Sequence, residues 1–73
     1  MSYRVHSSNL HNHIKYYREL RGLTQTDLGK LVGLSKASIS KLENQCNGTT
    51  AYVAYLLCVV LNVSFTDLFY LSI

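Results

Sequence analysis

The chain has 73 residues, 48% of them hydrophobic and 15% charged, and a formal net charge of +3. Its length predicts one domain, residues 1–73, with a small core, and its apolar content predicts a surface covered by a second molecule. Two cysteines are too few for a disulfide scaffold, and the amino terminus resembles no signal peptide. The apolar run AYVAYLLCVVL is too short to span a bilayer. We therefore expect a cytoplasmic protein without a membrane partner.

Charge is unevenly distributed along the chain. All seven basic residues and three of the four acidic residues lie within positions 1–44, whereas Asp67 is the only charged residue from position 45 onward. A positive amino-terminal part favours a polyanionic partner, and an apolar carboxy-terminal part favours a protein partner. An ordinary solvated basic face remains the alternative.

Apolar residues recur at spacings of three and four and proline is absent, which predicts an all-α fold of five helices. The first helix should begin near Ser8 or Asn9, either of which can cap it, and end at Gly22. Its inward face would carry Leu10, Ile14 and Tyr17.

The second and third helices are predicted to be short and adjacent. Thr24 caps the second helix, with Asp27 completing a weak capping box, and Gly33 ends it. Ser35 then caps the third helix. The residues of both helices that point inward are expected to be Leu28, Val32, Ile39 and Leu42.

A loop with the sequence NQCNGTT separates the third helix from the fourth. Asn47-Gly48 is a turn signal, and Thr49 or Thr50 is expected to cap a fourth helix over about residues 51–61. Ser64 and Asp67 form another capping pair, which opens a short fifth helix.

Two short helices joined by the tight turn VGLS have the geometry of a helix-turn-helix. Serine can donate or accept a hydrogen bond, alanine can touch a thymine methyl group, and lysine can reach guanine or a phosphate, so the outer face suits the DNA major groove. An ordinary amphipathic surface helix is the alternative. The outward residues of the third helix are Ser35, Lys36, Ala37, Ser40, Lys41 and Asn44.

The run LTQTDLGKLVGLSKASISKLEN resembles the helix-turn-helix of the Cro/repressor family, also called the XRE family, of small phage and bacterial transcriptional regulators. The segment LNVSFTDLF resembles the closing part of that family, so the resemblance covers about residues 10–69. It implies a compact five-helix, lambda-repressor-like domain with the helix-turn-helix at helices two and three. The matching positions are Leu23, Thr24, Gln25, Leu28, Gly33, Leu34, Ser35, Ile39, Leu42 and Glu43.

The resemblance also implies roles for individual residues. Gln25 would contact a phosphate, and the helix starts at Thr24 and Ser35 would direct backbone amides toward phosphates. Arg18 and Glu43 occupy positions where the family often places an ion pair between helices one and three. Base edges would be faced by Ser35, Lys36, Ala37 and Lys41, and the DNA backbone or bases by Ser38, Ser40 and Asn44.

Three departures from the family pattern affect these expectations. Gly29 stands where the family usually has alanine, which lowers helix propensity by roughly 0.5 to 1 kcal/mol. Asn62 replaces a usual glycine, and asparagine also reaches the left-handed conformation. The loop NQCNGTT lacks the lysine or arginine with which many relatives hold phosphate, so a single subunit should bind with modest affinity.

The fourth helix is predicted to form a homodimer interface. The family pattern turns Ala51, Ala54, Leu57, Cys58 and Leu61 inward, and none of the remaining positions of this helix is charged. A helix that is apolar all round should be buried all round. A tail that folds back over the helix is the alternative to a second copy. The predicted interface residues are Tyr52, Tyr55, Leu56, Val59, Val60 and Phe69.

These features predict a dimeric, sequence-specific regulator that binds a palindromic or near-palindromic DNA operator, with RNA polymerase as a further partner. Phage Cro-like repressors and restriction-modification controllers are both compatible. No catalytic cluster or cofactor motif is present, and His11 and His13, two positions apart, diverge on a helix, so with His6 they predict no metal site. The alternative is a protein-interaction module, an antitoxin or antirepressor, that uses the fourth helix.

Overall fold

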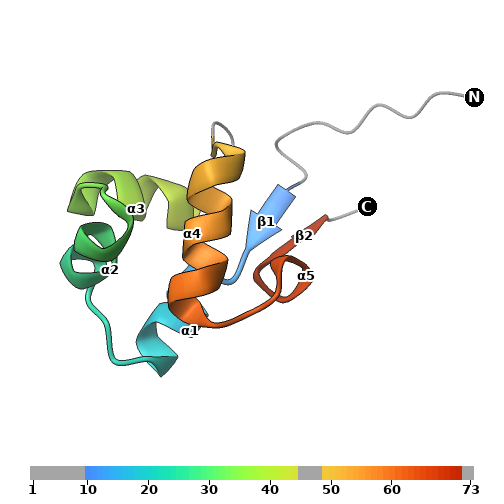
Figure 1. Cartoon of the computed structure of the whole chain (residues 1–73), viewed down its shortest axis with the longest axis horizontal. Helices are drawn as coiled ribbons and strands as arrows, with labels where there is room; N and C mark the ends of the chain where they lie inside the picture. Colours follow the sequence, from blue (N-terminus) through green and yellow to red (C-terminus); the bar gives the residue numbers. More distant parts are fainter. Residues whose placement is uncertain (1–9, 45–48, 72–73) are drawn as a thin grey trace, which may run out of the picture.

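The computed structural model describes residues 10–44 and 49–71, which form five helices and a two-stranded sheet (Figure 1). Helices α2 and α3 lie at one end of the molecule and the sheet at the other, with α4 between them (Figure 1). The expected helical fold is therefore confirmed. None of the described helices is long and apolar enough to cross a membrane. In chain order the elements are β1 Leu10–Asn12, α1 Ile14–Leu20, α2 Gln25–Val32, α3 Lys36–Asn44, α4 Ala51–Leu61, α5 Phe65–Leu68 and β2 Phe69–Leu71.

The start of the first helix differs from the prediction. Strand β1 occupies Leu10–Asn12 and pairs antiparallel with β2, so α1 begins only at Ile14. Residues Ser8 and Asn9 lie outside the described residues. The partner strand is at the far end of the chain, and local periodicity around β1 carries no information about such a distant pairing.

The predicted helix ends are confirmed for α2 and α5. Thr24 Oγ1 accepts a hydrogen bond from the Asp27 amide at 3.0 Å, and the Asp27 carboxylate accepts one from the Thr24 amide, also at 3.0 Å. Hydrogen bonds to the Asp27 carboxylate, first from the Thr24 amide and then from the Thr24 side chain, lower the pKa of Asp27. Ser64 and Asp67 form the equivalent capping box at α5.

The remaining helix ends also agree with the sequence where they are described. Thr50, rather than Thr49, caps α4 by accepting from the amide of Val53. Gly33 and Asn62 end α2 and α4 in the left-handed conformation, with φ of 77° and 56°. The expected turn at Asn47-Gly48 lies outside the described residues.

The core lies where α1, α2, α3, α4 and α5 meet. Two predicted positions are wrong: Ala51 is exposed at the start of α4, and Phe69 is only 4% exposed. Pairing of β2 with β1 turns Phe69 into the core, so it is not available to a dimer interface. Leu42 and Cys58 are half-buried. The buried apolar residues are Ile14, Leu28, Val32, Ile39, Ala54, Leu57, Leu61, Leu68 and Phe69.

The turn between α2 and α3 leaves little room beside Gly29. A Cβ atom at this position would collide with the backbone carbonyl oxygen of Leu34. The two backbones approach this closely because the Leu34 amide donates to the Gly29 carbonyl oxygen at 2.8 Å. The glycine therefore does more than lower helix propensity, since it allows the chain to turn tightly enough to place α3.

Replacing Gly29 by alanine should destabilise the domain. The added methyl group overpacks the turn, at a typical cost of about 1 to 3 kcal/mol, and most of this range lies above the gain of roughly 0.5 to 1 kcal/mol in helix propensity. Urea unfolding of Gly29→Ala measures the difference. The exposed neighbour provides the control, because Lys30→Ala should stay within about 0.5 kcal/mol of the parent. A Gly29→Ala protein more stable than its parent would contradict this account of the turn.

Candidate nucleic-acid interface

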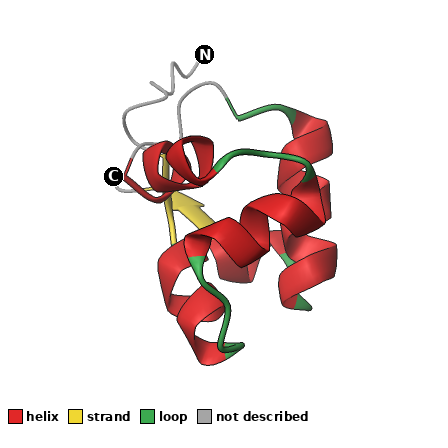
Figure 2. Cartoon of the chain, turned by 90° about the vertical axis from the view of Figure 1, so that its left-hand side faces the viewer, coloured by secondary structure: helices red, strands yellow, loops and turns green. Residues whose placement is uncertain are grey.

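Helices α2 and α3 form a compact pair whose inner faces meet in the core. Leu28 and Ile39 are fully buried between them, and Figure 2 views the chain from the end where the pair lies. The residues between the helices, Gly33 to Ser35, form the predicted tight turn. Because the inner face of α3 is fixed in this way, its opposite face is turned away from the core.

The outer face of α3 is open within the part of the chain that the structure describes. Its long cationic side chains, Lys36 and Lys41, are exposed, and so is Ala37 between them. The other predicted contact residues are also at the surface: Thr24, Ser35 and Asn44 are exposed, and Gln25, Ser38 and Ser40 are half-buried. The predicted residues of α3 are thus all exposed or half-buried, and none of them is a bulky apolar side chain.

Hydroxyl groups at the start of α3 are ordered by two hydrogen bonds. The Ser38 amide donates to Ser35 Oγ at 3.1 Å, which is the expected N-cap, and Ser35 Oγ donates to Ser38 Oγ, also at 3.1 Å. The hydrogen of the Ser35 hydroxyl is therefore used inside the protein. Ser38 keeps its own hydroxyl hydrogen, with which it can donate to an external acceptor.

A buried ion pair joins α1 to α3. Arg18 Nε donates to Glu43 Oε2 at 2.6 Å, and the two side chains are only 9% and 4% exposed. Arg18 Nη1 also donates to the carbonyl oxygen of Leu23 at 2.8 Å. The hydrogen bond to Glu43 raises the pKa of Arg18, although burial partly opposes this shift. The pair implied by the family resemblance is therefore present and holds a fixed geometry.

Gln25 belongs to the same network. The sequence did not indicate that Gln25 would contact Glu43. Its Nε2 donates to Glu43 Oε1 at 2.9 Å, linking the start of α2 to the end of α3. One amide hydrogen and the amide oxygen remain for an external partner. A depression at the start of α2 brings Gln25 together with Thr24 and Lys36, and Arg18 and Glu19 also line it.

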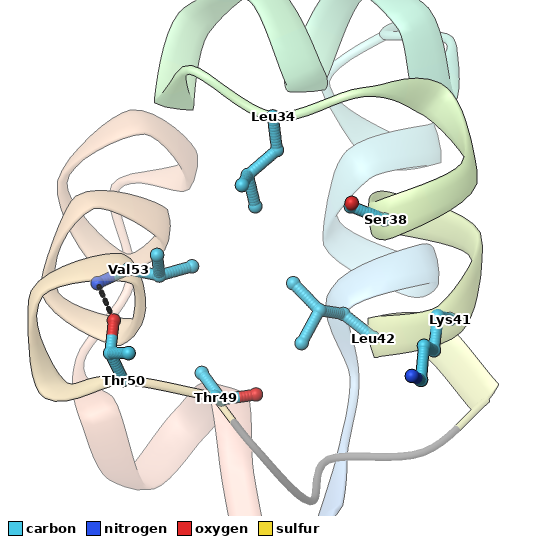
Figure 3. A pocket seen from close by; sticks show the side chains of 7 residues that line it. All are labelled: Leu34, Ser38, Lys41, Leu42, Thr49, Thr50 and Val53. Carbon is cyan, nitrogen blue, oxygen red and sulfur yellow. Dashed lines mark hydrogen bonds between the residues drawn. The ribbon is translucent and has the colours of Figure 1, made fainter.

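A hollow of about 300 Å³ separates the carboxy-terminal half of α3 from the start of α4. Leu34, Leu42 and Val53 point into it, and Ser38, Lys41, Thr49 and Thr50 complete its lining (Figure 3). Sequence spacing did not indicate this hollow.

Helix α4 presents an apolar surface on the other side of the domain. Tyr52, Tyr55 and Val59 are 70%, 66% and 57% exposed, and Leu56 and Val60 are half-buried beside them. The carboxy-terminal strand does not cover these residues in the described chain, because β2 pairs with β1 instead. Of the six predicted interface residues, only Phe69 lies in the core.

No cluster of three or more metal-ligating side chains occurs among the described residues. His11 and His13 stack on Tyr70, with ring centroids 5.3 and 4.6 Å from it, and His6 lies outside the described residues. Burial raises the pKa of the Cys58 thiol, which opposes formation of a nucleophilic thiolate.

A profile of the helix-turn-helix family matches residues 14–68, from α1 to α5. The chain belongs to the XRE-type helix-turn-helix family. The match confirms the resemblance seen in the sequence, and it includes both members of the buried ion pair.

Individual relatives are consistent with this family. The antitoxin PezA of Streptococcus pneumoniae is 33% identical over 55 residues, which are 75% of this chain but 35% of PezA, so the chain spans about a third of that relative. An uncharacterized HTH-type transcriptional regulator of Methanocaldococcus jannaschii is 34% identical over 58 residues, or 80% of this chain and 88% of the relative. A crystal structure of a putative DNA-binding protein from Bacteroides fragilis superposes with a TM-score of 0.73 at 21% identity, covering 84% and 98% of the two chains, which shows the shared fold.

Removing one member of the ion pair should be strongly destabilising. Glu43→Ala leaves the Arg18 guanidinium buried without its partner, and such a loss typically costs about 3 to 5 kcal/mol. Urea unfolding of this variant should therefore show a much lower midpoint. Glu19→Ala is the matched control, because Glu19 is exposed on α1 and its loss should cost at most about 0.5 kcal/mol. Equal effects of the two substitutions would show that the pair does not hold α3.

Proposed function

We propose that this protein is a sequence-specific double-stranded DNA-binding transcriptional regulator that places α3 in the major groove. The observation that carries the proposal is the open outer face of α3, with Lys36 and Lys41 exposed around small side chains. The narrow side chains let the helix approach base edges closely, and the lysines can reach guanine or phosphate. The HTH-type regulator among the relatives supports the same function.

Phosphate contacts would orient α3 in the groove. The helix starts at Thr24 and Ser35 carry backbone amides that attract anions, and Gln25 lies beside the first of them. Phosphate contacts fix the register of a protein on DNA, whereas base contacts supply the specificity. In this arrangement Ser35, Lys36, Ala37 and Lys41 face base edges, while Ser38, Ser40 and Asn44 lie near the backbone or bases.

The proposed active form is a homodimer that joins two copies through α4. Tyr52, Tyr55 and Val59 expose an apolar stripe that a small domain cannot bury by itself, and Leu56 and Val60 extend it. A two-fold contact would place the two α3 helices about 34 Å apart, matching one turn of DNA. The operator would then be palindromic or nearly so, and its occupancy would change the access of RNA polymerase to the promoter.

A protein-interaction module is the second candidate function. PezA is named an antitoxin, and the exposed apolar surface of α4 is suited to another protein as well as to a second copy. The two functions respond differently to salt. DNA binding should weaken steeply as ionic strength rises, whereas an apolar protein contact should change little.

Selection from a random duplex pool tests DNA recognition directly. The protein should enrich an inverted repeat, and Lys41→Ala should bind the selected duplex about tenfold more weakly because a base or phosphate contact is lost. Lys15→Ala is the control, because this exposed lysine lies on α1 rather than on the proposed interface. Recovery of no inverted repeat, or equal affinities of the two variants, would contradict the proposal.

Sedimentation velocity tests the dimer. Leu56 and Val60 also pack against the core, so the more exposed pair in Tyr55→Asp/Val59→Asp is the better probe. This variant should sediment as a monomer at a concentration where the parent is a dimer. Tyr16→Asp/Leu20→Asp changes a similarly exposed pair on α1, at 60% and 59%, and should remain dimeric. A dimeric α4 variant would contradict the interface.

A further inference from the structure

We propose that Asn12 is a positioning residue for DNA recognition, which ties the sheet formed by β1 and β2 to the end of α3. The inference rests on the proposed function, because it assigns the placement of the DNA-reading helix to a side chain far from the DNA surface. Its structural half, the link between Asn12 and α3, can be measured without DNA.

The two ends of the Asn12 amide make different hydrogen bonds. Nδ2 donates to the backbone carbonyl oxygen of Leu42 at 2.7 Å, and Oδ1 accepts from the backbone amide of Ile14 at 3.0 Å. His13, which directly precedes α1, makes no side-chain capping bond, so Asn12 performs the capping role from one residue earlier. A single side chain thus holds both the start of α1 and the end of α3.

The end of α3 has a specific need for such a donor. Leu42 lies within the last four residues of α3, whose carbonyl oxygens have no partner inside the helix. The hollow lies beside Leu42, between this part of α3 and the start of α4 (Figure 3). Polar links reinforce the packing of Leu42 against the core: Arg18 and Gln25 hold the side chain of Glu43, while Asn12 holds the backbone one residue earlier.

Loss of the hydrogen bond from Asn12 to Leu42 would change the positions of nearby residues of α3. Lys41 precedes it and Asn44 follows two positions later, and both are exposed on the proposed DNA surface. If the last turn of α3 moves or frays, both side chains lose their fixed distance to the groove. Since Asn12 lies opposite Phe69 in the sheet, the anchoring point is itself fixed by the core.

The substitution Asn12→Ser separates the two hydrogen bonds. Serine can still accept from the Ile14 amide, as serine caps do, but it is too short and lacks the amide donor to reach Leu42. Asn12→Ala removes both bonds and is the comparison. Amide hydrogen exchange by NMR reports on the first turn of α1 and the last turn of α3 separately, and fluorescence anisotropy reports affinity for a duplex half-site from the selection.

Asn12→Ser should leave exchange in α1 unchanged, accelerate exchange in the last turn of α3, and weaken half-site binding about threefold to tenfold, the usual worth of one hydrogen bond. Asn12→Ala should accelerate exchange in both helices. Unchanged exchange in α3 of Asn12→Ser would overturn the link, whether or not the protein binds DNA. Accelerated exchange with unchanged affinity for a duplex that the parent binds would overturn the positioning role. If the parent binds no duplex, the proposed function fails, and the exchange data still decide the link.

Discussion

The buried contact between Arg18 and Glu43 is the interaction on which the proposed interface depends. A helix that offers one face to DNA cannot be fixed by packing on that face, so its orientation must come from its other side and its ends. Ile39 supplies the apolar anchor on the inner side. The ion pair supplies a directional contact, because its two hydrogen bonds, at 2.6 and 3.4 Å, set the angle as well as the distance between α1 and α3. A buried pair of this kind adds little net stability, but its geometry is specific.

The small size of the domain explains how the remaining features fit together. One core must support every helix, and among residues 10–44 and 49–71 it leaves the end of α3 beside a hollow and the outer side of α4 uncovered. At the end of α3, hydrogen bonds from side chains of α1, α2 and β1 compensate for the limited core. On the outer side of α4, a second copy of the chain would cover Tyr52, Tyr55 and Val59 in the proposed dimer. The proposed DNA-binding surface and the apolar surface are thus separate consequences of the same limited core.

Sequence reasoning predicted the features that depend on neighbouring residues. Capping boxes such as Thr24 with Asp27 join positions three apart, and the bounds of α4 follow from its threonine cap and its terminal asparagine. It failed where distant segments meet. Nothing near Leu10–Asn12 indicates pairing with β2. The start of α1 was therefore predicted too early in the chain, and Phe69 was predicted at an interface although it is buried in the core. The clash that a Cβ atom at Gly29 would cause, and the hydrogen bond from Asn12 to Leu42, likewise cannot be predicted without knowing the path of the backbone.

In the proposed complex, the outer face of α3 is the docking surface for duplex DNA. The decisive experiment is an NMR titration of the isotope-labelled protein with its selected duplex. The largest amide shifts should occur at Ser35, Lys36, Ala37 and Lys41, with only small changes along α4. Large shifts at Tyr52, Tyr55 and Val59 with no change along α3 would contradict this assignment.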